Sequence, residues 1–379
     1  MKIAYIYTAL TTVGGADRVI TEKANYFADK LKYDVYIITD SQGKEIPKFP
    51  LSPKVHLVNL NIMFGQQYNH SFFIRGFIYF KLMRKYKREL IKQLMTIRPD
   101  FTISILGRDV DFITSIKDGS KKIAEAHTTR KNIRNFELLK KKNFIYKVIG
   151  KIWESKLEKA INKFNKLVVL TEDDASEWAE IKDSIVIPNS LPFYPKKRSY
   201  NSNKKAISVG RFEIEKGHDR LIDVWSEVIK KHPDWILEIY GEGTLKNGLI
   251  DIAKEKGLSD SILFKPSSMN IDKEYIDSSF CIMTSRYEGF GMVLIEAMAC
   301  GLPCIAYDCP SGPRNIIKDG INGFLIKDGD VQKMAEKICI LIEHEDIRKK
   351  MGQAGYLNIK KYNIDEIMNK WKQLFESLK

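Results

Sequence analysis

The chain has 379 residues, of which 44% are hydrophobic and 29% are charged, and it carries a formal net charge of +14. This length predicts two domains or one large one, and the composition excludes an intrinsically disordered protein. No run of about 18 uncharged apolar residues is present, so we expect no transmembrane helix. The five cysteines form no C-x-x-C pair and have no histidine cluster beside them, so we expect core residues and no metal site.

The first residues, MKIAYIY, predict an apolar strand that leads into a turn at Gly14 and Gly15. A segment with helical periodicity and a second strand follow, which is the opening unit of a doubly wound α/β domain. The opening strand is too short for a signal peptide, so we expect a cytoplasmic protein. Taken alone, the glycine turn fits a ligand loop and an ordinary tight turn equally well.

Residues 61–100 combine aromatic and basic side chains. Residues 72–80, from Phe72 to Phe80, are rich in phenylalanine, and a basic segment with an apolar helical face follows. Such a segment can pack on the sheet with a solvated basic face, or it can lie on a membrane surface. We expect the first arrangement for residues 84–95. For residues 72–80, peripheral contact with the cytoplasmic face of the membrane remains open.

Two further features of the first half lie beside strands. Asp109 and Asp111 match a D-x-D pattern, but they stand where acids favour the dipole of a helix start, and we interpret them in that way. Residues 122–126 predict a strand that ends at His127. Ligands of open α/β sheets bind at strand ends, although a single histidine is more often structural.

A domain boundary is predicted near residue 190. Thr171 has the character of an N-cap at the start of a helix, and residues 185–189 predict the last strand of the first half. The next stretch is rich in Pro, Ser, Asn and Lys. We therefore predict domains at 1–190 and 205–361, joined by a linker at 191–204.

The α/β pattern restarts after the linker. A strand runs into Arg211, and Lys216 follows five residues later, just before a helix that begins at His218. Two fixed cations at this spacing suit a diphosphate, because they can neutralise charge on a leaving group. The alternative is a pair of solvated basic residues.

Residues 280–307 carry the most informative pattern, a strand, a glycine-containing loop, a helix and a strand. A helix that begins near Gly291 directs its free N–H groups and positive dipole end toward the strand ends, which suits a phosphate or diphosphate. Gly289 and Gly291 leave the backbone open to a ligand. Phosphate would repel Glu288 and Glu296, so we expect these carboxylates to accept hydrogen bonds from sugar hydroxyls.

The string SRYEGFGMVLIEAMACGLPCIAYDCPSGP, with seven residues between Glu288 and Glu296, resembles the paired-glutamate motif of family-4 retaining glycosyltransferases. The segment V-G-R-x-x-x-x-K-G resembles that family's donor-phosphate pair, and EAHTTR resembles its first-domain segment. The turn after the helix is similar to the branch that acts on bacterial surface polysaccharides and lipid-linked sugars. The resemblance implies the α/β GT-B fold, with two facing Rossmann-like doubly wound domains, a cleft between them, and residues 362–379 crossing back onto the first domain.

The resemblance also implies a role for each candidate residue. Glu288 would contact the donor sugar, Glu296 the ribose, and Pro266 would lie in the loop that holds the base. Catalytic roles are implied for Glu288, His127, Arg211 and Lys216. The donor would be bound by Gly15, Arg211, Lys216, Pro266, Glu288, Gly289, Phe290, Gly291, Met292 and Glu296.

The activity implied is a metal-independent, retaining transfer without a cofactor. A hexose or N-acetylhexosamine would move from a nucleotide-sugar, with a UDP-sugar favoured, to a saccharide or polyprenyl-linked saccharide. A nucleic-acid partner is not expected, because the chain shows no base-reading module. Two alternatives remain: a nucleotide-sugar epimerase on the same fold, and a non-catalytic sugar-nucleotide-binding subunit of a transferase complex.

Overall fold

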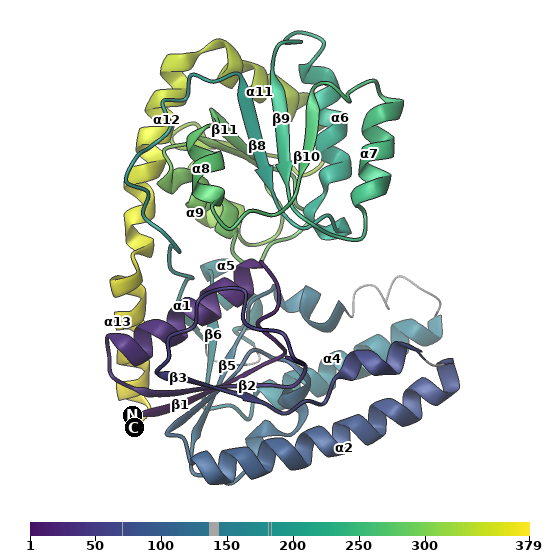
Figure 1. Cartoon of the computed structure of the whole chain (residues 1–379), viewed down its shortest axis with the longest axis vertical. Coiled ribbons are helices and arrows are strands. Elements are labelled where there is room, and N and C mark those ends of the chain that lie inside the picture. The colour runs from purple at the N-terminus through teal and green to yellow at the C-terminus, as the bar shows by residue number, and fades with distance from the viewer. Residues whose placement is uncertain (70, 136–143, 181, 183) are drawn as a thin grey trace. The chain divides into compact units, whose positions relative to one another are not determined.

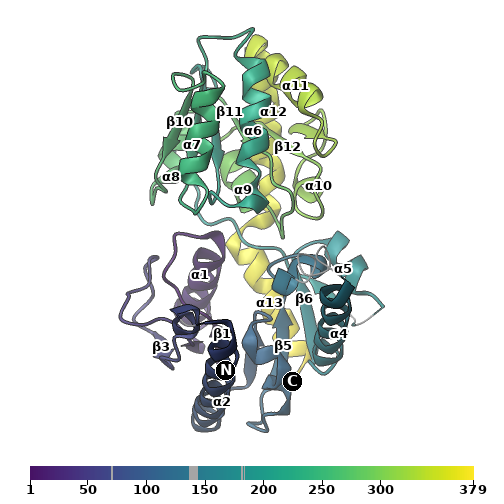
Figure 2. The same cartoon turned by 90° about the vertical axis from the view of Figure 1, so that its right-hand side faces the viewer.

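The computed structural model describes residues 1–69, 71–135, 144–180, 182 and 184–379. Contacts divide the chain into two compact units, one of Met1–Ile187 with Ile367–Lys379 and one of Pro188–Glu366. Each unit contains a sheet of parallel strands flanked by helices, as Figures 1 and 2 show. Both units therefore have the Rossmann-like α/β architecture that the sequence predicts.

The described strands of the first unit follow the order β3-β2-β1-β4-β5-β6-β7. The strand order reverses between β1 and β4, and ligands of open α/β sheets bind beyond the strand ends at such a point. The strands are β1 (Lys2–Tyr7), β2 (Asp34–Thr39), β3 (Val55–Asn59), β4 (Phe101–Ser104), β5 (Lys121–Glu125), β6 (Lys166–Val169) and β7 (Ser184–Val186). The helices are α1 (Gly15–Asp29), η1 (Phe64–Asn69), α2 (Phe72–Ile97), η2 (Arg108–Asp111), η3 (Ile113–Ser115), η4 (Arg130–Asn135), α4 (Phe144–Ile161) and α5 (Glu172–Trp178).

The second unit repeats the plan with the strand order β10-β9-β8-β11-β12-β13, and its order reverses between β8 and β11. The strands are β8 (Lys205–Val209), β9 (Ile236–Tyr240), β10 (Ile262–Lys265), β11 (Phe280–Met283), β12 (Cys304–Tyr307) and β13 (Gly323–Ile326). The helices are η5 (Ile214–Lys216), α6 (His218–Val228), α7 (Lys246–Glu255), α8 (Ile271–Ile276), α9 (Met292–Ala299), α10 (Pro313–Ile316), α11 (Val331–Glu343), α12 (Glu345–Asn358) and η6 (Ile359–Tyr362).

The last helix, α13 (Ile364–Ser377), contributes its C-terminal part to the first unit. Its apolar face is buried there, because the Phe375 ring lies 4.7 Å from that of Phe101 and 5.6 Å from that of Phe27. Trp371, one turn earlier, is also buried and contacts the edge of Phe27. The two ends of the chain thus share one apolar core.

The segment at residues 191–204, expected to be a linker, belongs to the second unit. The backbone N–H of Ser199 donates to the carbonyl of Cys300 at 2.8 Å, and the Asn201 side chain donates to the carbonyl of Gly301 at 3.1 Å. A segment with polar and proline-rich composition is therefore anchored by backbone partners that its own sequence does not reveal. The N-cap prediction for Thr171 is confirmed, since its hydroxyl accepts from the N–H of Asp174 at 3.2 Å.

Helix α2 is packed in its second half and exposed in its first half. Its second half is packed, with Tyr86, Leu90 and Leu94 buried in the core of the first unit. In its first half Phe77 and Phe80 are 72% and 55% exposed. The side chains of Phe72 and Phe73 lie outside the described residues. None of the helices within the described ranges is long and apolar enough to cross a membrane.

Candidate active site

The predicted cation pair follows β8, at the carboxyl end of the second sheet. The turn that carries it closes at Gly217, whose φ of +64° lies in the left-handed region that favours glycine. A Cβ there would lie 2.2 Å from the carbonyl oxygen of Thr284, and the Thr284 hydroxyl donates to the carbonyl of Gly217 at 2.9 Å. Glycine at this position therefore lets the turn after β8 dock directly on the end of β11.

This docking brings Lys216 to Glu288. Nζ of Lys216 donates to Oε1 of Glu288 at 2.7 Å, and the Ser285 hydroxyl donates to the same oxygen at 2.6 Å. Both charged side chains are largely shielded from solvent, with exposed fractions of 21% and 11%. Partial burial weakens solvent screening, so the ion pair fixes both side chains at the end of the sheet.

The turn at residues 308–313 packs against the backbone of Glu288. Residues Glu288 and Ser311 form an isolated bridge, and the N–H of Glu288 points to the carbonyl of Pro310 at 3.5 Å. A Cβ at Gly312 would lie 2.6 Å from the Phe290 carbonyl oxygen and 2.9 Å from Cβ of Glu288. Any larger residue at position 312 would displace the loop that carries the first glutamate.

Helix α9 begins directly after Gly291, which has a φ of +98° and serves as its N-cap. The prediction of a helix start at Gly291 is confirmed. Glu296 lies one turn into α9 and is buried, and the Tyr275 hydroxyl donates to its Oε2 at 3.3 Å. Burial first and the Glu296 carboxylate second raise the pKa of Tyr275, which keeps the phenol protonated as a donor.

The remaining candidates of the second unit differ in how they are held. Arg211 is 65% exposed and its guanidinium contacts Oε1 of Glu215 at 2.5 Å, so Lys216 is the partner of Glu288 and Arg211 is not. Pro266 is exposed just beyond β10. Phe290 is buried with its ring edge-on to Tyr362 at 5.3 Å. Gly289 and Met292 lie next to the helix start, half-buried.

In the first unit, Gly15 is the first residue of α1 at the switch point of the sheet. The loop before it is fixed by Asp17, which accepts from the Thr12 N–H at 2.8 Å, the Thr12 hydroxyl at 2.9 Å and the Tyr7 hydroxyl at 2.5 Å. These bonds hold the loop over the end of β1. The glycine turn is thus a loop held in place by hydrogen bonds, at a position where ligands of this fold bind.

His127 follows β5, as predicted, and its side chain is 14% exposed. Its Nε2 atom lies 3.2 Å from Oε1 of Glu125, and the ammonium group of Lys23 hydrogen-bonds the same oxygen. Sequence reasoning missed Lys23 and Glu125, together with Ser285, Tyr275 and Gly312 in the second unit. A usable signal existed for Glu125, a charged residue at the end of an apolar strand.

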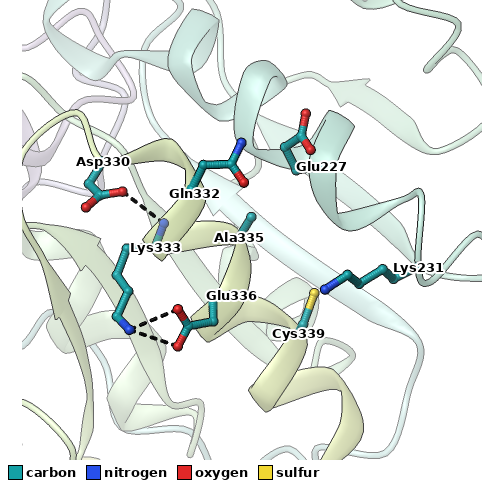
Figure 3. Close-up of a pocket in the computed structure, with 8 residues that line it drawn as sticks. All are labelled: Glu227, Lys231, Asp330, Gln332, Lys333, Ala335, Glu336 and Cys339. Atoms are coloured by element: carbon teal, nitrogen blue, oxygen red, sulfur yellow. Dashed lines mark hydrogen bonds and ion pairs between the residues drawn. The ribbon is translucent and has the colours of Figure 1, made fainter.

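Two surface hollows of the second unit are lined by residues other than the candidate site residues. One of about 420 Å³ lies on α6 and α11, where Lys333 pairs with Glu336 and Lys231 points toward Cys339 (Figure 3). Another of about 440 Å³ is lined in part by Arg198 and Lys349. Within the described ranges, no group of three or more His, Cys, Asp or Glu side chains is arranged to hold a metal ion.

Comparison with known proteins identifies the family of the chain. The sequence profile described as "Glycosyl transferases group 1" matches residues 193–358. An uncharacterised glycosyltransferase of Haemophilus influenzae is 30% identical over 378 residues, which cover 98% of this chain and 99% of that protein. The chain belongs to the group 1 glycosyltransferases.

Two further relatives extend the comparison of this glycosyltransferase. The poly(ribitol-phosphate) alpha-N-acetylglucosaminyltransferase of Staphylococcus aureus is 31% identical over 220 residues, covering 57% of this chain and 45% of that protein. The crystal structure of a TarM mutant from S. aureus, with fondaparinux, alpha-GlcNAc-glycerol and UDP, aligns with a TM-score of 0.78 at 19% identity, covering 99% of each chain. This likeness establishes the GT-B fold.

Proposed function

We propose that this glycosyltransferase is a retaining, metal-independent enzyme of family 4. It transfers a hexose or N-acetylhexosamine from a UDP-sugar to a saccharide or polyprenyl-linked saccharide acceptor in the synthesis of a cell-surface polymer. The observation that carries the proposal is the contact of Lys216 with Glu288 beside the N-terminus of α9. A cation, a carboxylate and free helix N–H groups at one sheet edge match the diphosphate and hydroxyls of a sugar nucleotide.

In this proposal the donor extends along the carboxyl edge of the second sheet. Glu288 accepts hydrogen bonds from the sugar hydroxyls, and the buried Glu296 accepts from the ribose hydroxyls. The backbone of Gly289, Phe290, Gly291 and Met292 offers N–H groups to the diphosphate. Pro266 lies in the loop that contacts the base, and Gly15 marks the first-unit loop that approaches the diphosphate.

The reaction proposed is a front-face displacement at the anomeric carbon. The bond from that carbon to the diphosphate oxygen breaks, the bond to the acceptor oxygen forms on the same face, and the leaving diphosphate takes the acceptor's proton. Lys216 and Arg211 stabilise the charge that develops on the diphosphate, while Glu288 and His127 orient the sugar. The scheme requires neither a metal ion nor a cofactor.

The choice of donor and acceptor rests on the relatives. One relative carries a name that gives a poly(ribitol-phosphate) acceptor and an N-acetylglucosaminyl group, and the TarM structure contains UDP. The exposed rings of Phe77 and Phe80 in the first half of α2, with Arg84 over the ring of Phe80, support a peripheral site on the cytoplasmic face of the membrane. A lipid-linked acceptor would be presented at that surface.

A thermal-shift panel tests the proposal. UDP, GDP, UDP-glucose, UDP-N-acetylglucosamine, UDP-galactose and GDP-mannose are added separately, in the presence of EDTA. A ligand that binds only the folded chain stabilises it by about 2.7 kcal/mol at 100 times its dissociation constant. We expect stabilisation by the UDP series, and a clearly smaller shift in Lys216→Met, with Lys230→Met, at an exposed position just after α6, as the matched control. Stabilisation by GDP compounds alone, or by none of the compounds, would contradict the proposal.

A further inference from the structure

A buried charged cluster lies behind His127 in the first unit. Glu125 and Lys23 have side-chain exposed fractions of only 1% and 3%, and they are joined by a hydrogen bond between Lys23 Nζ and Glu125 Oε1. Lys23 comes from α1, and Glu125 from the end of β5. Buried ion pairs contribute little net stability compared with apolar residues of similar volume. Stability alone therefore does not explain the buried ion pair of Lys23 and Glu125.

The contact with His127 supplies a further role for this pair. Nε2 of His127 lies 3.2 Å from the same Oε1 atom, in a charge contact without hydrogen-bond geometry, and it has no hydrogen-bond partner among the described residues. A carboxylate beside one ring nitrogen determines which nitrogen carries the proton and how the ring is oriented. With Nε2 facing Glu125, Nδ1 is the ring nitrogen left to face a substrate.

The surroundings keep Glu125 ionised. Burial alone raises the pKa of a carboxyl group, but Lys23 and His127 outweigh it and lower the pKa of Glu125 to about 2. The buried Tyr5 on β1 also faces this carboxylate, and burial followed by Glu125 raises the pKa of Tyr5, so the phenol stays neutral. Around neutral pH, Glu125 is therefore a fixed negative charge beside the histidine ring.

The C-terminal helix completes the cluster. The Lys23 ammonium lies 4.5 Å from the centre of the Trp371 ring of α13 and 5.8 Å from that of Tyr5. Cation–π contacts of this kind stabilise a desolvated ammonium group. Lys23 is thus held by a carboxylate on one side and by aromatic rings on others, and it has little freedom to leave Glu125.

We propose that Glu125, clamped by Lys23 from α1 and Trp371 from α13, is the positioning residue that fixes the ring of His127 with Nε2 inward and Nδ1 toward the substrate. The assignment of His127 to the donor site rests on the proposed function. The clamp itself does not, since it is a property of the free protein. The clamp connects α1, β5 and α13 through one buried charged cluster.

The test replaces the pair with apolar residues of similar volume, Lys23→Met with Glu125→Leu, because such exchanges of buried ion pairs are often neutral or stabilising. Lys23→Leu with Glu125→Met is the second choice if the first variant does not fold. The matched control is Lys122→Met with Asp118→Leu, which removes another buried pair, joined at 2.6 Å, at the other end of the same strand.

The primary readout is ¹⁵N NMR of the imidazole rings in the full-length chain without any ligand. The chain has six histidines, so the signals are few, and His127→Ala assigns the relevant one. We expect a single Nε2-protonated tautomer of His127 in the unmodified chain and in the control. The variant with Lys23→Met and Glu125→Leu should show a mixture of His127 tautomers. If the folded variant with Lys23→Met and Glu125→Leu kept the same His127 tautomer, the proposal would be overturned.

The kinetic readout is turnover of UDP-N-acetylglucosamine. Loss of a group that orients a metal-ligating histidine typically costs between about tenfold and a hundredfold, and we take this range for His127. We expect a loss of this size in kcat with little change in KM, and no added loss when the exchange is combined with His127→Ala. Fully additive losses would show that the pair acts independently of His127. Absence of turnover by the unmodified chain would count against this donor, while the NMR result would still decide the role of Glu125.

Discussion

Lys216 and Glu288 come from segments 72 residues apart and meet at 2.7 Å at the end of the second sheet. Two long side chains that are already fixed lose less conformational freedom when a ligand binds, so their contact lowers the cost of binding. The Ser285 hydroxyl fixes the carboxylate further. The geometry of the site is therefore built into the fold of the second unit.

The first prediction concerns Glu288. Glu288→Gln keeps the shape of the side chain but removes the charge that holds Lys216 and that, in the proposed function, accepts hydrogen bonds from the sugar hydroxyls. We expect kcat to fall about a hundredfold or more, because an interaction directed at the transition state is lost, while UDP binding changes little. Steady-state kinetics and calorimetric titration with UDP measure the two effects. Glu343→Gln, at an exposed position, is the control, and full turnover by Glu288→Gln would remove this residue from the site.

We predict that His218 makes the stability of the second unit dependent on pH. It is buried at the start of α6, with Nε2 lying 3.3 Å from the carbonyl oxygen of Gly210. Burial above all lowers the pKa of His218 to about 4. Between its usual value of about 6.5 and this value, the unfolded chain binds a proton that the folded chain does not.

The free energy of unfolding should therefore fall as the pH is lowered from about 6.5 to about 4, with a contribution from His218 of about 3 kcal/mol at most. His218→Gln keeps a donor to Gly210 but does not titrate. Urea unfolding at several pH values, followed in both proteins, isolates the histidine because all other groups are shared. Parallel pH curves for the two proteins would rule this contribution out.

At the scale of elements, α2 divides into a buried half and an exposed half. Its second half is anchored by core residues such as Tyr86 and Leu90, while the first half presents Phe77 and Phe80 to solvent beside basic residues. Arg84 lies 4.6 Å from the centre of the Phe80 ring. Exposed aromatic rings next to cations suit the interface of an anionic membrane.

We predict that the chain binds vesicles containing phosphatidylglycerol and that Phe77→Asp with Phe80→Asp weakens this binding roughly tenfold or more, since each ring contributes apolar area. Co-sedimentation at low and high salt measures the effect. Ile321→Asp with Leu357→Asp is the matched control, because it changes two exposed apolar residues of the second unit. Equal binding by the two double variants would argue against α2 as the contact.

At the scale of the whole molecule, the C-terminal residues complete the first unit. Phe375 is fully buried against Phe27 of α1 and Phe101 of β4. The chain therefore forms the complete core of its first unit only when its last helix is in place. This dependence makes the stability of the first unit a property of the full chain.

We expect Phe375→Ala to destabilise the first unit by about 3–5 kcal/mol, as is usual for truncating a buried phenylalanine. Hydrogen exchange followed by mass spectrometry should show faster exchange in β1 and β4, with β8 and β11 unchanged. Phe77→Ala, the same change at an exposed position, should leave exchange in both sheets as it was. Faster exchange confined to the second unit would contradict this account of α13.

The sequence by itself determined the α/β class, the strand–turn–helix pattern that opens each half of the chain and the helix start at Gly291. These features depend on local periodicity and on glycines whose backbone angles few other residues tolerate, so they can be recognised within short segments. The spacing of Arg211 and Lys216 after a strand also placed both residues at a sheet edge. The polar composition of residues 191–204 predicted a linker, but it gives no sign of the hydrogen bonds that this segment makes to Cys300 and Gly301.

The tertiary structure alone decided which of these residues meet. It paired Lys216 with Glu288 and gave Arg211 to Glu215, and it placed Lys23 against Glu125, 102 residues away in sequence. The physical reason is that such contacts depend on the order of strands in the sheet and on close backbone approaches that neither partner encodes alone. Local sequence specifies which chemistry is available at each strand end, and the packing of the strands selects the partners.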